Sequence, residues 1–301
     1  MSAIKNVIKK FPGILLLKDY LRKASNERFM REYGIAVEKL QQKHGVKPPL
    51  FSAIEIETIN RCNGVCRFCP VNRHDDTREY RKMNDELFDR IIKNLQQLQY
   101  NGSLALYSNN EPFLDDRLES LAQKARNALP DAYIHITTNG TLLTLDKFKK
   151  IIPFLNHMHI NSYGNGVKKH KNALRIYEYC NDNSKIMGKV SFYETDIKAV
   201  RTSRGGQAPN KKEIKSLSPV KCHLPWVQMV VRPTGEVSLC CNDGLGKYTL
   251  GNAGFQTLEE IWQSQAYIGV RRNLMSSRVN LELCKHCDSI QHTIPLANPL
   301  I

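Results

Sequence analysis

The sequence lacks any long apolar segment. Its longest apolar run near the start covers only residues 14–17, which is shorter than the core of a secretory signal peptide. No segment approaches the roughly 20 apolar residues that a transmembrane helix needs. Disorder is excluded as well, because 41% of the 301 residues are hydrophobic, enough for one large domain or a domain with a smaller companion. We therefore predict a folded cytoplasmic protein.

Acidic residues are scarce relative to basic ones. Lys and Arg number 44 against 29 Asp and Glu, a formal charge of +15, which favours anionic partners such as nucleic acid, an acidic membrane or an anionic substrate. Residues 1–47 alone hold eleven basic and four acidic side chains. Their apolar spacing predicts a basic N-terminal extension of one or two amphipathic helices, broken at Pro12-Gly13. It either packs on the main domain or makes a peripheral contact with a membrane or a partner.

Residues 48–205 alternate short β-type runs with longer helical ones, a pattern typical of βα units. The predicted strands cover residues 53–57, 103–108, 133–137, 157–161 and 189–194, and the predicted helices cover 85–97, 117–128, 145–155 and 170–179. Right-handed crossovers would arrange five such strands as an α/β open or partial barrel, too few for a closed eight-stranded one. The chemistry of such folds lies at the carboxyl ends of the strands.

A different kind of segment begins after residue 205. Residues 226–231 and 236–240 flank an Arg-Pro-Thr-Gly turn and predict a β-hairpin. A predicted helix over 258–274 follows, and then a cysteine-rich end. We therefore expect a second, smaller domain over residues 206–301.

Nine cysteines, an odd number, argue against a disulfide framework in a reducing compartment. Cys62, Cys66 and Cys69 form C-x3-C-x2-C after the first predicted strand. Three thiolates so close in sequence can hold three corners of a cubane iron-sulfur cluster and leave one iron open to a small molecule. Zinc is the alternative, with His74 as the nearby fourth ligand.

Three segments together resemble the radical S-adenosylmethionine (SAM) enzymes. An aromatic residue precedes the last cysteine, a Ser-Asn-Asn-Glu-Pro segment stands where the family has Gly-Gly-Glu-Pro, and a Thr-Asn-Gly turn follows the third predicted strand. In that family these segments lie near the adenine, the amino group and the ribose and methionine of SAM. The resemblance therefore implies that SAM is bound by Phe68, Ser108, Asn109, Asn110, Glu111, Thr138 and Asn139.

The resemblance also implies a fold and a reaction. The family fold is a partial (β/α)6 TIM-like barrel. Its cluster, a [4Fe-4S] centre, is reduced by an electron donor such as flavodoxin or ferredoxin, and SAM is then cleaved to a 5'-deoxyadenosyl radical. That radical abstracts hydrogen from an unactivated carbon of the substrate.

A second cysteine group consists of Cys222, Cys240, Cys284 and Cys287. Its spacing around the predicted hairpin resembles the SPASM/twitch extension of the same superfamily. Four ligands would close one auxiliary [4Fe-4S] cluster, whereas the two-cluster form needs about three further cysteines. The resemblance thus implies the single-cluster twitch type, with a zinc knuckle at 284–287 as the alternative.

Other residues are candidates for the substrate site. Arg204 could grip a carboxylate, a phosphate or a hydroxyl pair in bidentate fashion. Glu194, at the end of the last barrel strand, could bind SAM or substrate. Cys241 is either a spare core thiol or the donor of a hydrogen atom to a substrate radical. Tyr107 and Tyr163 lie near strand ends and could line the pocket.

The resemblance implies a radical SAM oxidoreductase or epimerase. We expect a small polyhydroxylated substrate, such as a sugar, an aminocyclitol or a nucleotide sugar, and the charge favours an anionic one. Oxidation would send an electron to the auxiliary cluster, whereas epimerisation would need a hydrogen donor. A peptide maturase is the alternative within the family. An RNA-binding or RNA-modifying protein is the alternative outside it, disfavoured because few aromatic residues stand among the basic ones.

Overall fold

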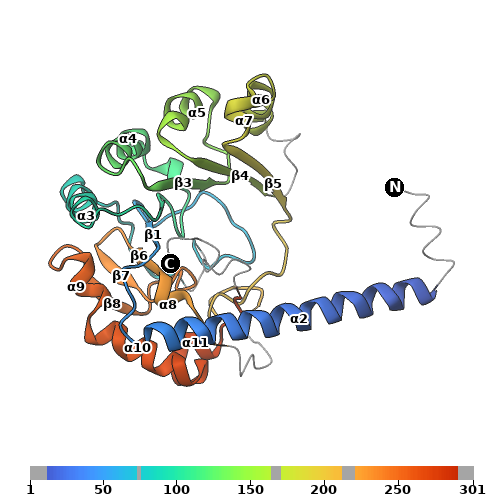
Figure 1. The fold of residues 1–301 in the computed structure, drawn as a ribbon. Helices are drawn as coiled ribbons and strands as arrows, with labels where there is room; N and C mark the ends of the chain where they lie inside the picture. The colour runs from blue at the N-terminus through green and yellow to red at the C-terminus, as the bar shows by residue number, and fades with distance from the viewer. Residues whose placement is uncertain (1–11, 73–75, 164–170, 212–220, 291–301) are drawn as a thin grey trace.

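The fold is built on one open sheet of eight strands in the order β5-β4-β3-β2-β1-β6-β7-β8 (Figure 1). The computed structural model describes residues 12–72, 76–163, 171–211 and 221–290. The strands are β1 (Ala53–Ile56), β2 (Ser103–Ala105), β3 (Tyr133–Thr138), β4 (His157–Tyr163), β5 (Val190–Thr195), β6 (Gln228–Val231), β7 (Glu236–Ser238) and β8 (Thr249–Asn252). Strands β1 to β6 run parallel to one another, and β7 and β8 continue the sheet beyond β6 with antiparallel pairing. The predicted partial barrel is confirmed.

Helices cover the outer side of the parallel strands (Figure 1). They are α3 (Asp85–Gln97), α4 (Leu118–Ala128), α5 (Leu145–Ile151), α6 (Lys171–Asn181) and α7 (Ser184–Met187). In α3, Phe88, Ile91, Ile92 and Leu95 are buried, the spacing that places apolar side chains on one helix face. Asn84 begins this helix, since its side chain accepts a hydrogen bond from the backbone N–H of Leu87 at 2.8 Å. The predicted start of α6 at residue 170 lies outside the described residues.

The sixth parallel strand comes from the C-terminal part of the chain. Strand β6 pairs with β1, with Glu55 opposite Val230, so the predicted hairpin of β6 and β7 extends the barrel sheet. Trp226 belongs to a short helix, α8 (Leu224–Val227), and β6 therefore starts later than we predicted. The domain boundary near residue 205 falls between β5 and β6 and stays a prediction.

The predicted helix over 258–274 is two helices, α9 (Leu258–Trp262) and α10 (Gln265–Ser276). Ser264 separates them, because its side chain caps α10 by accepting a hydrogen bond from the backbone N–H of Tyr267. A 3-10 turn, η4 (Arg278–Asn280), and a last helix, α11 (Glu282–Lys285), follow. Strand β2 ends three residues earlier than predicted, because Asn110 Oδ1 accepts a hydrogen bond from the backbone N–H of Ser108 at 2.9 Å and turns the chain.

A long helix, α2 (Pro12–His44), precedes the barrel and projects from the body of the molecule in Figure 1. The helix begins at Pro12, a residue well tolerated in a first turn; residues 1–11 lie outside the described residues, so the predicted break at Pro12-Gly13 stays a prediction. Apolar positions do not follow one face over the whole length of α2, so the amphipathic prediction is wrong for this helix as a whole. Towards its C-terminal end, Tyr33, Val37 and Leu40 are buried. No helix in the described ranges is both long and apolar enough to span a bilayer.

Candidate active site

A cavity of about 330 Å³ opens at the carboxyl ends of the parallel strands. It is lined by residues that follow β1, β2 and β3, by the end of β4 and by the segment after β5. The predicted site residues in its wall are Cys62, Cys66, Phe68, Cys69, Tyr107, Ser108, Asn109, Asn110, Glu111, Thr138, Asn139, Tyr163 and Arg204. The folded chain thus brings together segments separated by more than one hundred residues.

The first cysteine group lies in the loop after β1. Cys62 Sγ accepts a hydrogen bond from the backbone N–H of Gly64 at 3.2 Å, and a Cβ at Gly64 would stand only 3.3 Å from that sulfur. Burial raises the pKa of Cys62 to about 12, so the thiolate form needs a bound metal centre. The backbone donor and the open approach to the sulfur fit a cluster, whose sulfur ligands commonly accept such bonds.

Glu111 is 1% exposed and ties the second and third strand loops together. Its carboxylate accepts hydrogen bonds from Thr138 Oγ1 at 2.6 Å, Asn139 N at 2.8 Å and Phe113 N at 3.2 Å. Burial raises its pKa, although these donors oppose the shift. A carboxylate offers about four acceptor positions, so one remains for an ammonium group of a ligand in the cavity.

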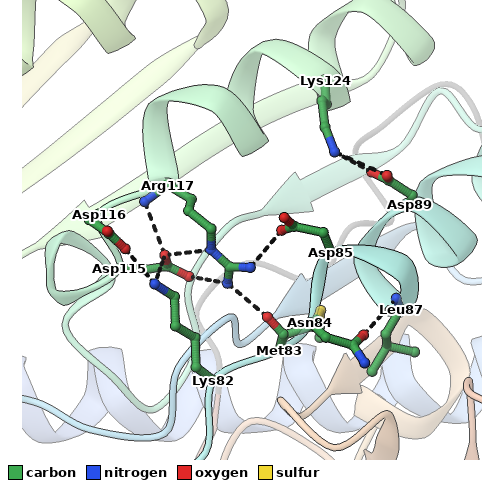
Figure 2. Close-up of polar contacts among 10 residues, drawn as sticks. All are labelled: Lys82, Met83, Asn84, Asp85, Leu87, Asp89, Asp115, Asp116, Arg117 and Lys124. Atoms are coloured by element: carbon green, nitrogen blue, oxygen red, sulfur yellow. Dashed lines mark hydrogen bonds and ion pairs between the residues drawn. The ribbon is translucent and has the colours of Figure 1, made fainter.

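An ion-pair cluster fixes the segment directly after Glu111 (Figure 2). The side chain of Asp115 is fully buried and pairs with Arg117 at 2.9 Å and Lys82 at 3.2 Å. Burial alone would raise the pKa of Asp115, but its hydrogen bonds with Arg117 hold that pKa below the usual value. Arg117 also donates to Met83 O at 2.7 Å and to Asp85 Oδ1 at 2.5 Å. These contacts anchor the Glu111 loop to the start of α3.

Two further features of the cavity wall fit a bound SAM. Asn110 Nδ2 is buried and has no hydrogen-bond partner in the described part of the protein, so a ligand carboxylate could accept from it. Phe68 packs near Tyr163, with ring centroids 5.9 Å apart, and the Arg201 guanidinium lies 5.4 Å from its ring. This aromatic pair offers a surface for an adenine ring.

Arg204 lies where the cavity meets the C-terminal part of the chain. Its Nη2 donates to the carbonyl of Cys241 at 2.9 Å and to Asn109 Oδ1, while its Nε is buried without a partner among the described residues. Arg204 and the two following glycines all have positive φ, and a Cβ at Gly205 would come within 2.5 Å of Leu283. The turn therefore needs glycine to pass closely over α11.

The structure does not bring Glu194 to the cavity. Its side chain is exposed, whereas the neighbouring Thr195 faces inward and donates to Asn161 Oδ1 at 3.0 Å. Successive strand residues point to opposite faces, so Glu194 lies on the outer side. Cys241 is close to the cavity through its carbonyl, but it is not among the described residues that line it. Burial raises the pKa of the Cys241 thiol to about 12.

The second cysteine group gathers residues from three stretches of the chain. Cys222 precedes α8, Cys240 follows β7, and Cys284 and Cys287 belong to and follow α11. Their thiols lie close enough to influence one another electrostatically, and burial raises the pKa of Cys240, Cys284 and Cys287. Cys287 Sγ accepts a hydrogen bond from the backbone N–H of Ser289 at 3.4 Å, again a donor suited to a cluster ligand.

Sequence reasoning missed a buried arginine in this second group. Arg278 is 5% exposed and donates to the carbonyls of Cys287, Ser289 and Lys221 at 3.0 to 3.2 Å. In the described part of the chain it pairs with no carboxylate. Its positive charge interacts with the thiols of Cys222, Cys284 and Cys287. No local pattern distinguishes this arginine from the chain's many surface cations.

Within the described ranges, no three His, Cys, Asp or Glu side chains converge as ligands of one metal ion. His74, the fourth ligand in the zinc alternative, lies outside those ranges.

Comparison with known proteins agrees with the iron-sulfur interpretation. Residues 56–183 match the radical SAM superfamily, and residues 222–288 match the SPASM iron-sulfur cluster-binding domain. The S-adenosyl-L-methionine-dependent 2-deoxy-scyllo-inosamine dehydrogenase of Niallia circulans is 27% identical over 243 residues, which cover 80% of this chain and 94% of that protein.

Solved structures show the same architecture. BtrN in complex with AdoMet and 2-DOIA is 25% identical, with a TM-score of 0.68 over 81% of this chain and 95% of that one. Native anSMEcpe with bound AdoMet, 15% identical, shares the fold at a TM-score of 0.53 over 78% and 89% of the two chains. The chain therefore belongs to the radical SAM superfamily, carries a SPASM/twitch iron-sulfur region, and is an oxidoreductase that uses SAM and two [4Fe-4S] clusters.

Proposed function

We propose that this enzyme oxidises a secondary alcohol of a small polyhydroxylated substrate, an aminocyclitol or a sugar, to a ketone. The observation that carries the proposal is the second cysteine group, which lies behind the cavity and is joined to it through the Arg204–Cys241 contact of 2.9 Å. Such a centre can accept the electron that oxidation releases. The dehydrogenase activity named for the Niallia circulans relative supports the same reaction type.

The residues of the cavity have separate tasks in this proposal. Cys62, Cys66 and Cys69 hold the cluster, and Glu111 orients the SAM amino group. With one electron supplied, the cluster and SAM together provide the 5'-deoxyadenosyl radical that removes hydrogen from carbon. Arg204 orients the substrate.

Product stoichiometry tests the proposal. We would reconstitute the enzyme without oxygen, reduce it with dithionite and supply 2-deoxy-scyllo-inosamine or related cyclitols and sugars. A dehydrogenase forms one 5'-deoxyadenosine per ketone. An epimerase would instead place solvent deuterium in the product, and Cys241→Ala would abolish that labelling. A reduced enzyme that makes 5'-deoxyadenosine but no ketone from any of these alcohols would refute the proposal.

Three accompanying assignments are also proposals. A one-electron donor such as flavodoxin or ferredoxin supplies the reducing electron, because no described residue can do so. All nine cysteines are described and none of them forms a disulfide, which suits a cytoplasmic location. The basic residues 1–47 could hold the enzyme on an acidic membrane surface, which flotation with anionic vesicles, with and without these residues, would test.

A further inference from the structure

Oxidation of an alcohol releases a proton as well as an electron. The electron has an acceptor in the second cysteine group, but the proton still needs one. Two tyrosines line the cavity, but burial raises the pKa of Tyr163 to about 12 and also raises that of Tyr107, so both stay protonated. Glu111 accepts three hydrogen bonds, and its remaining acceptor position is the one assigned to the SAM amino group. A proton acceptor must therefore be found elsewhere in the wall.

Glu55 stands directly behind the cavity on β1. Its Oε2 accepts a hydrogen bond from Ser108 Oγ at 2.6 Å, and its Oε1 accepts one from Gln228 Nε2 at 2.8 Å. Gln228 Oε1 in turn accepts from the backbone N–H of Cys241 at 3.2 Å. Glu55 is thus held in place from both sides of its own strand, by the segment after β2 and by β6.

Ser108 connects this carboxylate to the cavity, whose wall it forms in part. Its hydroxyl donates to Glu55 and accepts from Asn109 Nδ2 at 3.2 Å. A hydroxyl has one donor and two acceptor positions, and no other described residue bonds to this oxygen. The remaining acceptor position is available to a hydroxyl of a molecule in the cavity.

We propose that Ser108 and Glu55 form the proton exit of the oxidation. Once the carbon has lost its hydrogen atom, the substrate O–H bond breaks and the C=O double bond is completed. The proton passes to Ser108 Oγ as the Ser108 proton passes to Glu55 Oε2, and the remaining electron leaves to an iron-sulfur acceptor. The Ser108 hydroxyl touches the substrate, and Glu55 acts through it. This step rests on the alcohol oxidation proposed above.

The surroundings of Glu55 suit a base that works near neutral pH. Burial raises its pKa to about 7, against the opposing influence of Ser108 and Arg204, and the ideal catalytic pKa lies near the working pH. The other titratable groups that face it electrostatically are Glu57, Tyr107 and Cys241. Part of its surface stays accessible, so the proton can leave for solvent.

The test compares Glu55→Gln with the wild type on 2-deoxy-scyllo-inosamine. We expect 5'-deoxyadenosine to form in both, while ketone per 5'-deoxyadenosine falls about 100-fold in the variant, the lower range for loss of general base catalysis. Wild-type ketone formation should rise with pH through about 7 and the residual rate of the variant should not.

Ser108→Ala should reproduce the loss and Ser108→Thr should rescue it, because threonine keeps the hydroxyl. Glu57→Gln is the matched control, since Glu57 lies in a separate hollow with Arg78 and Arg232.

A second measurement separates this inference from the proposed function. Infrared difference spectra of the loaded enzyme, wild type minus Glu55→Gln, should show a carboxyl group that protonates near pH 7 and shifts in Ser108→Ala. If the wild type makes no ketone but its Glu55 carboxyl still titrates near pH 7, the proposed oxidation is refuted, whereas the acid–base pair of Ser108 and Glu55 is not. If the carboxyl stays ionised to pH 5, or Glu55→Gln keeps the wild-type product ratio and pH profile, the proton exit is refuted.

Discussion

The two cysteine groups of this molecule differ in how they are enclosed. The first has three members within one loop, and all three line an open cavity. The second has four members drawn from three separate stretches of the chain, beside a buried arginine. Three ligands beside a cavity leave room for a small molecule on the metal centre, whereas four ligands away from it leave none.

This difference shows how one sheet can serve two kinds of centre. The first loop follows β1. In the second group Cys222 precedes β6 and Cys240 follows β7, and these two strands continue the sheet from β1 outward. Arg204 and the Cys241 carbonyl connect the two regions. We therefore expect substitutions in the first group to stop radical formation and substitutions in the second to stop the disposal of the electron.

The largest expected effect separates the two groups directly. Cys66→Ala should lower the iron content from about eight to about four per chain and abolish 5'-deoxyadenosine formation. Cys284→Ala should lose a similar amount of iron and all ketone, yet still cleave SAM. Cys180→Ala is the control, because Cys180 is fully buried in α6 outside both groups. If Cys284→Ala keeps its first cluster but fails to cleave SAM, the assignment of radical formation to the first group and of electron disposal to the second is wrong.

A smaller effect concerns the ligand of the open group. Glu111→Gln keeps the shape of the side chain but removes the charge that would hold an ammonium group. Hydrogen bonds to charged groups contribute about 1.5–3 kcal/mol, so SAM affinity should fall by a factor of roughly 10 to 150. Equilibrium dialysis of SAM against the reconstituted protein measures this, with Glu57→Gln as the matched buried carboxylate. Unchanged affinity would remove Glu111 from the SAM site.

Local patterns in the sequence predicted the elements well where short-range chemistry decides them. Helix α3 has the predicted bounds because its buried apolar positions repeat at helical spacing behind an Asn cap. The cysteine loop and the Glu111 segment were found for a similar reason, since each function needs particular residues close together in the chain.

Pairings between distant segments were not predictable in this way. Nothing in residues 228–231 indicates that they pair with β1 rather than form a separate hairpin. Glu194 was assigned to the site because a strand end was located but its register was not, and a shift of one residue exchanges the two faces. Glu55 and Arg278 were missed because their roles come from neighbours on other elements.

The buried Arg278 lies beside only one of the two cysteine groups. Arg278→Gln removes a positive charge beside the second group only, so the reduction potential of that cluster should fall by on the order of 60 mV, a tenfold change in the one-electron equilibrium. Redox titration followed by electron paramagnetic resonance measures both clusters, and the first serves as the internal reference. Arg278→Lys, which keeps the charge, should restore most of the difference. Equal shifts of both potentials would contradict a local effect.

The smallest expected effect concerns how α2 supports the second group. The Tyr33 hydroxyl of α2 lies 3.0 Å from His223 Nδ1, within hydrogen-bond distance, and burial lowers the pKa of His223 to about 4, so the ring is neutral at pH 7. Tyr33→Phe should cost about 1 kcal/mol and lower the melting temperature by about 2–4 °C. Exposed Tyr177 provides the control, Tyr177→Phe.

Wild-type stability should also decline as pH falls from about 6.5 towards 4, because the unfolded His223 then binds a proton that the folded ring resists. Scanning calorimetry under anaerobic conditions measures both, and an unchanged melting temperature in Tyr33→Phe would mean that this hydrogen bond does not stabilise the contact between α2 and the second group.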